Sequence, residues 1–251
     1  MSGMIFILGL MIGSFLNVCI YRIPQGMSVA YPGSHCPVCQ HGLGALDLIP
    51  VLSYLGLGGK CRYCKTKYSI RYSLVELLTG ALFLMTYWQN DNIYDLVKYL
   101  ILTCYLVVVA FIDLDHMEIY DKVNGLAAIA GVAFLFRGDV MENFVSYGLG
   151  ALIGLAIIGL IILVTHGAMG SGDMILLGVV GLYIGYEYIF LCFVLSTIIA
   201  SLISLGLIAF KVKSRKDYIP FGPFIAIAAW ICALWGEQIW GTYLQWLAKG
   251  F

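Results

Sequence analysis

Charged side chains are scarce in this chain of 251 residues. Lys and Arg number 14, Asp and Glu also number 14, and all four types together make up only 11% of the sequence, whereas 61% of it is hydrophobic. The mean hydropathy of +0.94 lies outside the range of soluble globular domains. The equal counts of the two charge signs give no basic bias, which argues against a nucleic-acid partner. The composition therefore predicts a polytopic membrane protein embedded in a lipid bilayer.

The first apolar run, residues 4–20, lacks the marks of a removable signal peptide. No charged segment precedes it, and it continues into NVCIYRIP where a cleavage site would have small residues. We expect this run to be retained as the first membrane helix. The chain also lacks a solenoid-type repeat and a low-complexity tract, so neither class of architecture is expected.

Seven further apolar runs approach the roughly 20 residues that cross a bilayer. They lie at about residues 74–88, 96–112, 123–136, 144–164, 174–186, 188–210 and 219–235. We therefore expect an all-α polytopic membrane protein of about eight transmembrane helices, with a small zinc-stapled cytoplasmic loop domain argued below. The expected domains are the first transmembrane helix at 1–20, the loop domain at 21–72 and a seven-helix membrane region at 73–251.

The basic residues predict the orientation. If the N-terminus is outside, only Lys98, Arg137 and Lys249 lie outside or near it. The other basic residues then lie on inside loops: Arg22, Lys60, Arg62, Lys65, Lys67, Arg71, Lys122, Lys211, Lys213, Arg215 and Lys216. The positive-inside rule therefore favours both termini outside. This orientation places the 21–72 loop, Asp113 and Asp173 at the cytoplasmic face of a cell membrane.

Four cysteines of the loop form two CxxC pairs. Cys36 and Cys39 belong to CPVC, Cys61 and Cys64 belong to CRYC, and 21 residues separate the pairs. This spacing is typical of a tetrahedral four-cysteine zinc site. A cytosolic loop argues against disulfides, and about 50 residues are too few for a large core without a staple. We expect structural zinc, with a redox role as the alternative.

Acidic side chains occur where two apolar runs end or begin. Asp113 follows the run 96–112 and opens a block that also holds Asp115 and Asp121, and Asp173 stands in GSGD before the run 174–186. Ionisable groups within membrane spans are costly and mark functional sites. Two carboxylates at the same depth share a proton and serve as general acid and base, as in aspartic proteases. The residues leave open a helix N-cap for Asp173, an ion- or proton-coupled transporter and a catalytically silent scaffold.

Six blocks in order along the chain resemble the type IV prepilin peptidases, a family of GxGD membrane aspartic proteases. They are GSFLNVCIYRIP, the CPVC and CRYC pairs, IRYSLVELLTG, FIDLDHMEIYD, GSGDMILLG and IPFGPF. The resemblance implies that Asp113 and Asp173 are the catalytic pair, with Asp115 and Asp121 as competitors for the first role. It also implies prepilin or pseudopilin precursors as substrates, with a short basic leader, a Gly before the cut and an apolar helix after it.

The resemblance implies a second activity, the methylation of the new N-terminal amine with S-adenosylmethionine. It places this activity in the loop domain at 21–72 and its flanking blocks, including GGKC around Gly59. The chain has no glycine-rich strand-turn-helix for the cofactor, so the cofactor-binding residues stay unassigned.

Two positions depart from the family pattern. Tyr120 replaces the usual Pro before the last acid of the first block, and Ile175 replaces the usual Lys after the GxGD motif. Neither departure removes a catalytic carboxylate. The IPFGPF block has a proline suited to a first helical turn. We therefore interpret it as the start of a helix, with a role in holding an extended substrate as the less favoured alternative.

Overall fold

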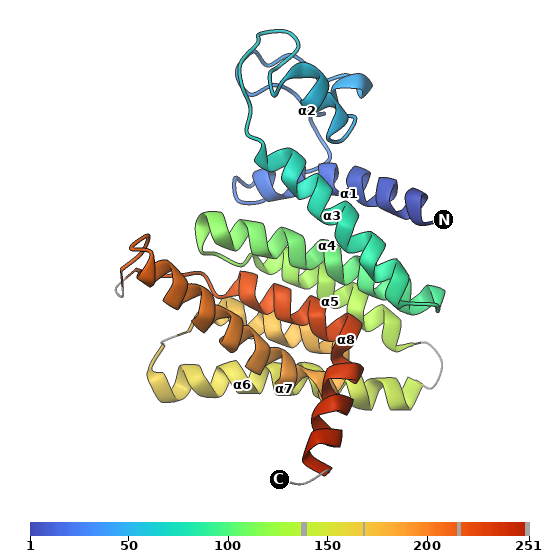
Figure 1. Ribbon diagram of the computed structural model, residues 1–251, viewed down its shortest axis with the longest axis vertical. Coiled ribbons are helices and arrows are strands. Elements are labelled where there is room, and N and C mark those ends of the chain that lie inside the picture. Colours follow the sequence, from blue (N-terminus) through green and yellow to red (C-terminus); the bar gives the residue numbers. More distant parts are fainter. Residues whose placement is uncertain (137–139, 168, 215–216, 249–251) are drawn as a thin grey trace. The chain divides into compact units, whose positions relative to one another are not determined.

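The computed structural model describes residues 1–136, 140–167, 169–214 and 217–248. Four of the basic residues used to predict the orientation lie outside these ranges: Arg137, Arg215, Lys216 and Lys249. The helices are α1 (Ser2–Arg22), α2 (Leu52–Leu57), α3 (Arg71–Gln89), α4 (Ile93–His116), α5 (Asp121–Leu135), α6 (Val140–Thr165), α7 (Ser171–Ala209) and α8 (Gly222–Ala248), with a short 3₁₀ helix η1 (Ala45–Asp47) (Figure 1). Extended pairing in the described residues is limited to two isolated bridges. The all-helical class is confirmed.

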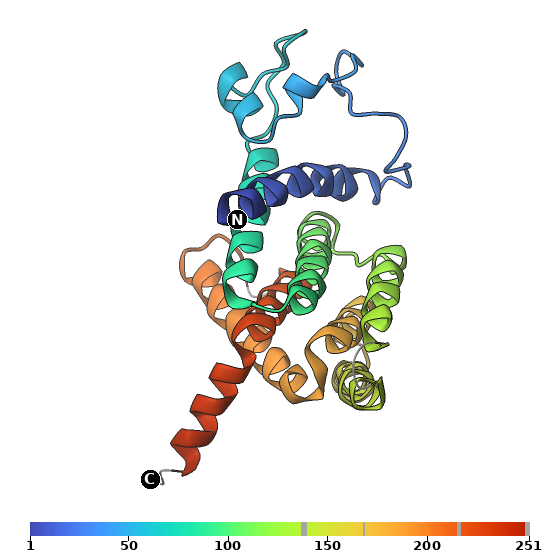
Figure 2. The ribbon, with the colours of Figure 1, turned by 90° about the vertical axis from the view of Figure 1, so that its right-hand side faces the viewer.

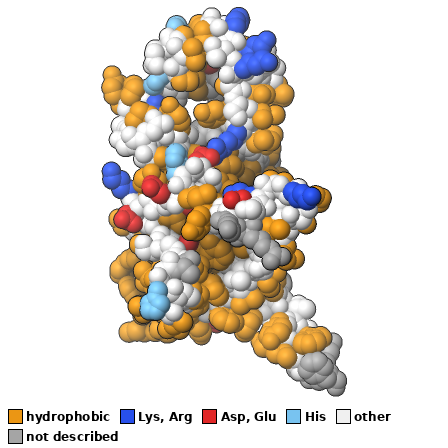
Figure 3. Space-filling view, turned by 90° about the vertical axis from the view of Figure 1, so that its left-hand side faces the viewer, with side chains coloured by type: hydrophobic (Ala, Val, Ile, Leu, Met, Phe, Trp, Pro, Cys, Tyr) orange, Lys and Arg blue, Asp and Glu red, His pale blue; other side chains and the backbone are white. Residues whose placement is uncertain are grey.

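The chain divides into two compact units, Met1–Leu96 and Val97–Phe251. Within the described residues, five helices are long and apolar enough to cross a membrane: α1, α4, α6, α7 and α8. Much of the helical surface is hydrophobic, as expected of a multi-pass membrane protein (Figure 3). Helix α5 has 15 residues, about 22 Å at 1.5 Å per residue, and so is shorter than a bilayer core. Helix α3 carries Arg71 and Glu76 within its first six residues.

The expected runs 174–186 and 188–210 are two arms of α7. Gly185, at φ 77° and ψ 175°, interrupts the helical backbone between them. A residue other than glycine is disfavoured at this φ, so the glycine permits the change of direction. Counting the two arms separately, the described residues form eight long helical segments. Five helices of this part of the chain, named above, are long and apolar enough to cross a membrane.

In the first unit, α1 and α3 approach each other through small residues. A Cβ atom on Gly9 would lie 2.7 Å from the Cα atom of Gly80, and one on Gly13 would lie 2.9 Å from the Cα atom of Glu76. Glycines four apart on one helix permit such backbone contact in membrane helix pairs. Residues 23–70, with η1 and α2, extend away from this pair, on one side of it (Figures 1 and 2).

In the second unit, α6 packs along the first arm of α7 through another row of glycines. A Cβ atom on Gly150 would lie 2.6 Å from the carbonyl oxygen of Gly181, and one on Gly154 would lie 2.6 Å from that of Leu177. Buried side chains of α4, α5, α6, α7 and α8 form the core around these helices, and Leu102, Ile158 and Tyr183 are fully buried in it. The glycine contacts of α6 with the first arm of α7 position the α7 backbone, which carries Asp173 in its first turn.

We expect Gly154→Ala to lower the thermal stability of the purified protein in detergent. The added methyl group has no room against the Leu177 carbonyl, and overpacking of this kind costs about 1–3 kcal/mol. Gly148→Ala on the same helix is the matched control, because its Cβ atom would meet nothing within 4 Å. Equal melting temperatures for the two variants would contradict the close contact.

Candidate functional site

Asp113 lies near the end of α4 and is buried, with 5% of its surface exposed. Its carboxylate oxygen Oδ2 accepts a hydrogen bond of 2.9 Å from the backbone N–H of Gly222. A Cβ atom on Gly222 would lie 2.6 Å from that oxygen. Glycine at this position therefore allows the backbone to approach the carboxylate, and the IPFGPF block contacts the first acidic block. The sequence of the IPFGPF block favoured a simple helix entry and gave no indication of this contact.

Asp173 is the third residue of α7, and the N-cap of that helix is Gly170 in an extended conformation. The backbone N–H of Gly170 donates to the Asp173 carboxylate, and Asp113 is near enough to interact with Asp173 electrostatically. Asp173 is thus not the N-cap residue, although it does form a capping hydrogen bond. The structure therefore brings Asp113 and Asp173, 60 positions apart in sequence, into one site.

The acidic block and the GSGD turn also meet through apolar packing. Helix α4 ends at His116. The next residue, Met117, has a left-handed φ of 55°, and its N–H still donates to the Asp113 carbonyl oxygen. The chain then brings Ile119 against Gly172, where a Cβ atom would lie 3.0 Å from that of Ile119. The second glycine of GSGD therefore leaves room for this side chain.

The competing acids of the first block are placed differently. Asp115 and Asp121 are exposed, in contrast to Asp113. Asp121 begins α5 directly after the N-cap Tyr120, whose φ of −82° is close to the range that proline fixes. The backbone thus keeps a proline-like angle where the family pattern usually has proline. Ile175, the second departure, packs against the core of the second unit.

The four loop cysteines form a compact cluster in the first unit. Their sulfur atoms all lie within 4.8 Å of one another, and the Sγ atoms of Cys36 and Cys64 are 3.8 Å apart. Four thiolates at about 2.3 Å from a tetrahedral zinc ion would be separated by about 3.8 Å. The donor set and its spacing fit a four-thiolate metal site.

Both CxxC pairs have the same local backbone. The N–H of Gln40 donates to the Cys36 carbonyl oxygen, and that of Lys65 donates to the Cys61 carbonyl oxygen. Gln40 and Lys65 each follow the second cysteine of their pair and have φ values of 57° and 60°. Two equivalent turns therefore present their thiols to one centre. Hydrogen bonds with Thr66 lower the pKa of Cys64 to about 6, which favours the thiolate form that binds metals.

Other side chains link the two turns without joining the cluster. The rings of His41 and Tyr63 lie 3.7 Å apart, centroid to centroid. Arg62 forms a 2.6 Å ion pair with Asp47, which holds the pKa of Asp47 below its usual value. Asp47 therefore serves as a contact between η1 and the second turn. His35 contacts the Gly33 carbonyl oxygen through Nδ1.

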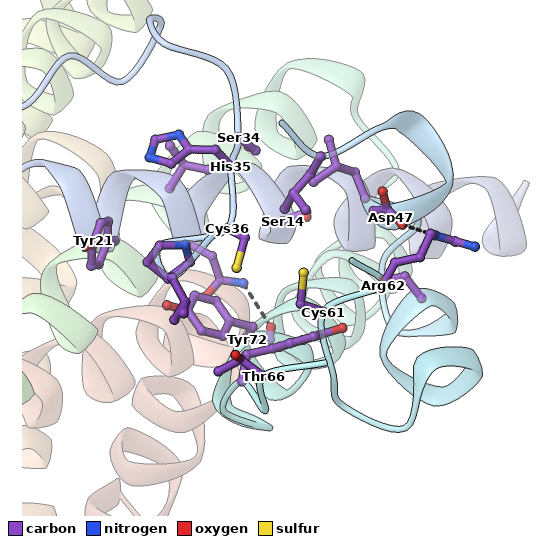
Figure 4. A pocket seen from close by; sticks show the side chains of 18 of the residues that line it. Ser14, Tyr21, Ser34, His35, Cys36, Asp47, Cys61, Arg62, Thr66 and Tyr72 are labelled. Carbon is purple, nitrogen blue, oxygen red and sulfur yellow. Dashed lines mark hydrogen bonds and ion pairs between the residues drawn. The ribbon is translucent and has the colours of Figure 1, made fainter. Parts of the chain in front are cut away.

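A cavity of about 500 Å³ opens beside the cysteine cluster within the first unit. Its walls come from α1, α3 and the loop, and Cys36 and Cys61 reach it from the two turns (Figure 4). Its polar and ionisable lining residues include Ser14, Asn17, Arg22, Asp47, Ser53, Lys60, Arg62, Lys67, Tyr68, Tyr72 and Glu76. Glu76 was not predicted as a site residue from the sequence. Its position as an acid inside the apolar run 74–88 could have indicated a functional role.

Gly59, of the GGKC block, supports the wall of this cavity. It has a φ of 65°, and a Cβ atom on it would lie 2.8 Å from the Tyr54 ring. Its carbonyl oxygen accepts the N–H of Tyr68, a lining residue whose ring meets that of Tyr54 edge to face. Gly59 thus permits the turn that positions Tyr68.

Comparisons with known proteins cover nearly the whole chain. Residues 7–90 match the Bacterial Peptidase A24 N-terminal domain, and residues 100–205 match the Type IV leader peptidase family. A protein of Aeromonas hydrophila is 34% identical over 96% of this chain and 93% of its own length. Proteins of Pseudomonas aeruginosa (32%; 95% and 92%) and Bacillus subtilis (30%; 98% and 98%) are similar to the same extent.

All three relatives are named prepilin leader peptidase/N-methyltransferase. No solved structure matches the chain. Two adjoining family matches and relatives at 30% identity or more over the full length agree with the ordered blocks of the sequence. The chain therefore belongs to the type IV leader peptidase family.

Proposed function

We propose that this chain is a membrane aspartic endopeptidase that removes the leader of type IV prepilin-like precursors, using Asp113 and Asp173, and then methylates the new N-terminus. The names of its full-length relatives support both activities. One observation supports the choice of these two residues. Asp113 is buried and accepts a hydrogen bond from the Gly222 N–H, and it lies near enough to Asp173 to interact with it electrostatically. Asp115 and Asp121, being exposed, are less suited to sharing a proton.

The chemistry follows from two neighbouring carboxylates that hold one proton between them. The ionised carboxylate takes a proton from water while the water oxygen attacks the scissile carbonyl carbon, and the protonated carboxyl donates to the carbonyl oxygen. In the collapse of the resulting gem-diol, the C–N bond breaks. The carboxyl that took the proton from water donates it to the leaving nitrogen, and the other carboxylate takes a proton from a gem-diol hydroxyl. The Gly222 N–H only donates, so it keeps Asp113 Oδ2 as an acceptor and leaves Oδ1 for the reaction.

We place the pair at the cytoplasmic face, with the N-terminus outside and about eight spans, from the distribution of basic residues. The substrates are prepilin or pseudopilin precursors. An ion- or proton-coupled transporter would also use intramembrane acids, but it would show flux that depends on Asp173 and no leader cleavage. A silent scaffold would tolerate loss of both aspartates.

The methylation is assigned to the first unit, in the cavity between α1, α3 and the cysteine loop. Its volume of about 500 Å³ lies within the usual range for small-molecule sites. Asn17, whose amide donates to the Tyr72 carbonyl oxygen, and Arg22, which donates to the carbonyl oxygens of Ser28 and Gly33, hold its wall. S-adenosylmethionine, when bound, supplies the methyl group as an electrophile on sulfur. The residues of this wall position the acceptor amine and exclude water.

Zinc is the proposed ion of the four-cysteine cluster, held by Cys36, Cys39, Cys61 and Cys64. Four thiolates close the coordination shell, which is typical of a structural site. The loop has few buried apolar side chains to replace such a staple: in residues 23–70, Cys36 and Cys61 are the buried hydrophobic residues. The ion therefore holds the fold of the loop and, with it, the wall of the cavity.

The aspartate assignment predicts a specific pattern of activity. Asp113→Asn and Asp173→Asn should each reduce cleavage of a model prepilin in detergent or liposomes by at least about 100-fold, because the pair loses its acid or its base. The exposed Asp115→Asn and Asp121→Asn are the matched controls and should retain cleavage. Activity without Asp173, or loss with Asp121 but not Asp113, would reject the pair.

Gly222→Ala should also abolish most cleavage while the protein remains folded. The new methyl group would occupy the space next to Asp113 Oδ2 and displace the carboxylate. Gly241→Ala on the same helix has open space around its Cβ position and should cleave like the wild type. Equal cleavage rates in both variants would show that the Gly222 contact is irrelevant to activity.

Metal analysis of the purified protein should find about one zinc per chain. Cys61→Ser should lose most of it, because three thiolates leave the shell open, and should lower the protein's resistance to proteolysis within the loop. Cys192→Ser, at a buried position in α7, is the control and should keep the zinc. A wild type without bound metal after preparation in zinc-containing medium would exclude the zinc site.

A further inference from the structure

Glu76 is a buried acid of the first unit, outside the proposed peptidase site. It lies on α3, is 8% exposed and lines the cavity. Helix α1 approaches the α3 backbone closely here, since a Cβ atom on Gly13 would lie 2.9 Å from the Glu76 Cα atom. Ser14, the next residue of α1, hydrogen-bonds to the Glu76 carboxylate. The packing of two helices thus holds the carboxylate at the cavity.

The donors that the structure places on this carboxylate are both neutral. The backbone N–H of Val51 donates to Glu76 Oε2 at 2.8 Å, and the other donor is Ser14. A buried carboxylate normally requires a charged partner as well as hydrogen bonds. Hydrogen bonds from neutral groups orient the carboxylate and leave its negative charge available to a cation that enters the cavity.

In the hydrogen bonds and ion pairs described for this unit, the basic side chains that line the cavity are directed to groups other than Glu76 or are exposed. Arg22 of α1 donates to loop carbonyl oxygens, and Arg62 is paired with Asp47 of η1. Lys60 and Lys67, which form a backbone bridge with each other, are exposed. The other titratable lining residues are His35, Tyr21, Tyr68, Tyr72, Cys36 and Cys61. Among these, Tyr68 is within electrostatic reach of Glu76.

Val51 shows that the Glu76 carboxylate is held under constraint. This β-branched residue has φ 62° and ψ −49° at the N-cap of α2, a conformation that costs about 1–3 kcal/mol. The hydrogen bond to Glu76 helps to maintain it. Strain of this kind is concentrated at functional sites, and here it sets the distance between α2 and the acid.

We propose that the Glu76 carboxylate binds the protonated N-terminal amine of the cleaved product and removes its proton before methyl transfer. The proposal rests on the methyltransferase activity proposed above and names the residue that prepares the acceptor. An ammonium group has no lone pair and cannot attack carbon. A single buried carboxylate with neutral donors matches the charge of that ammonium group and accepts its proton.

The transfer balances with the groups named. One proton passes from the ammonium nitrogen to a Glu76 oxygen, which leaves a neutral amine and a carboxylic acid. The amine lone pair then forms the new N–C bond to the methyl carbon of S-adenosylmethionine, and the C–S bond breaks with its electron pair on sulfur. The products are a protonated secondary amine and a neutral thioether, and Glu76 returns its proton to solvent.

The test uses the full chain, a pre-cleaved pilin peptide with a free amine, and S-adenosylmethionine with a labelled methyl group. We expect Glu76→Gln to lower the rate of methyl incorporation at least about tenfold near pH 7, where an α-amine of pKa about 8 is about nine-tenths protonated. The deficit should shrink as the pH rises to about 9, because the amine then loses its proton to solvent. The KM for the peptide should rise, while binding of the labelled donor in equilibrium dialysis should not change.

Controls separate this role from a structural one. Glutamine still accepts the Val51 N–H, so a purely structural Glu76 predicts near-normal methylation or a deficit that is the same at every pH. Thr86→Val on the same helix removes a buried hydroxyl that bonds only within its own helix and should methylate normally. Glu76→Asp, which keeps the charge, should recover part of the rate near pH 7.

Each other outcome has a distinct meaning. A deficit that does not change with pH, or a loss of donor binding, would overturn the proposal and assign Glu76 to the loop fold or to the donor. Leader cleavage by the same Glu76→Gln preparation should be normal, which shows that the chain is folded. If the wild type transfers no methyl group to the peptide, the proposed methyltransferase function itself fails. If the wild type methylates and Glu76→Gln does so at the same rate, only the role proposed for Glu76 fails.

Discussion

A carboxylate enclosed by apolar helices needs hydrogen-bond donors, because water does not reach it freely. In the second unit these donors are backbone N–H groups at the starts of two helices. Gly222 is the first residue of α8 and donates to Asp113, and Gly170 is the N-cap of α7 and donates to Asp173. N–H groups at a helix start have no partner within the helix, and the helix dipole adds a positive potential there. In the described residues, two helix N-termini thus supply donors to the two acids. Neutral donors of this kind are compatible with the proton sharing proposed above.

This arrangement depends on backbone positions, and glycine determines them. A Cβ atom on Gly222 would lie only 2.6 Å from Asp113 Oδ2, and one on Gly172 would lie 3.0 Å from the Ile119 Cβ atom. Farther along α7, the contacts of Gly150 and Gly154 with the α7 backbone fix how that helix lies on α6. Small residues at these contacts therefore position the carboxylates as directly as the hydrogen bonds do. A methyl group at any of these points would lie between 2.6 and 3.0 Å from a neighbouring atom, so the neighbour or the helix would have to shift.

Sequence patterns predicted the parts that depend on composition and local order. The apolar runs predicted helices, the two CxxC pairs predicted the cysteine cluster, and the acids at run ends drew attention to Asp113 and Asp173. The Gly222 contact was not predicted, because it joins residues 109 positions apart and IPFGPF has a sufficient local explanation as a helix start. Glu76 was missed for a similar reason, since only the crossing of α1 and α3 and the loop fold place Ser14 and the Val51 N–H around it. Long-range contacts of this kind depend on helix packing, which no local pattern records.

The acids of the two units have chemically different surroundings, and the difference suits the two reactions proposed above. Asp113 and Asp173 lie within electrostatic range of each other, and in the proposed function this proximity favours one proton shared between them. In the first unit, the donors to the Glu76 carboxylate in the described residues are the neutral Val51 N–H and Ser14. A single negative charge of this kind selects a cation. Cleavage creates such a cation, a new α-ammonium group, and methylation must consume it. In the proposed function, cleavage at Asp113 and Asp173 produces the ammonium group that the Glu76 carboxylate would accept.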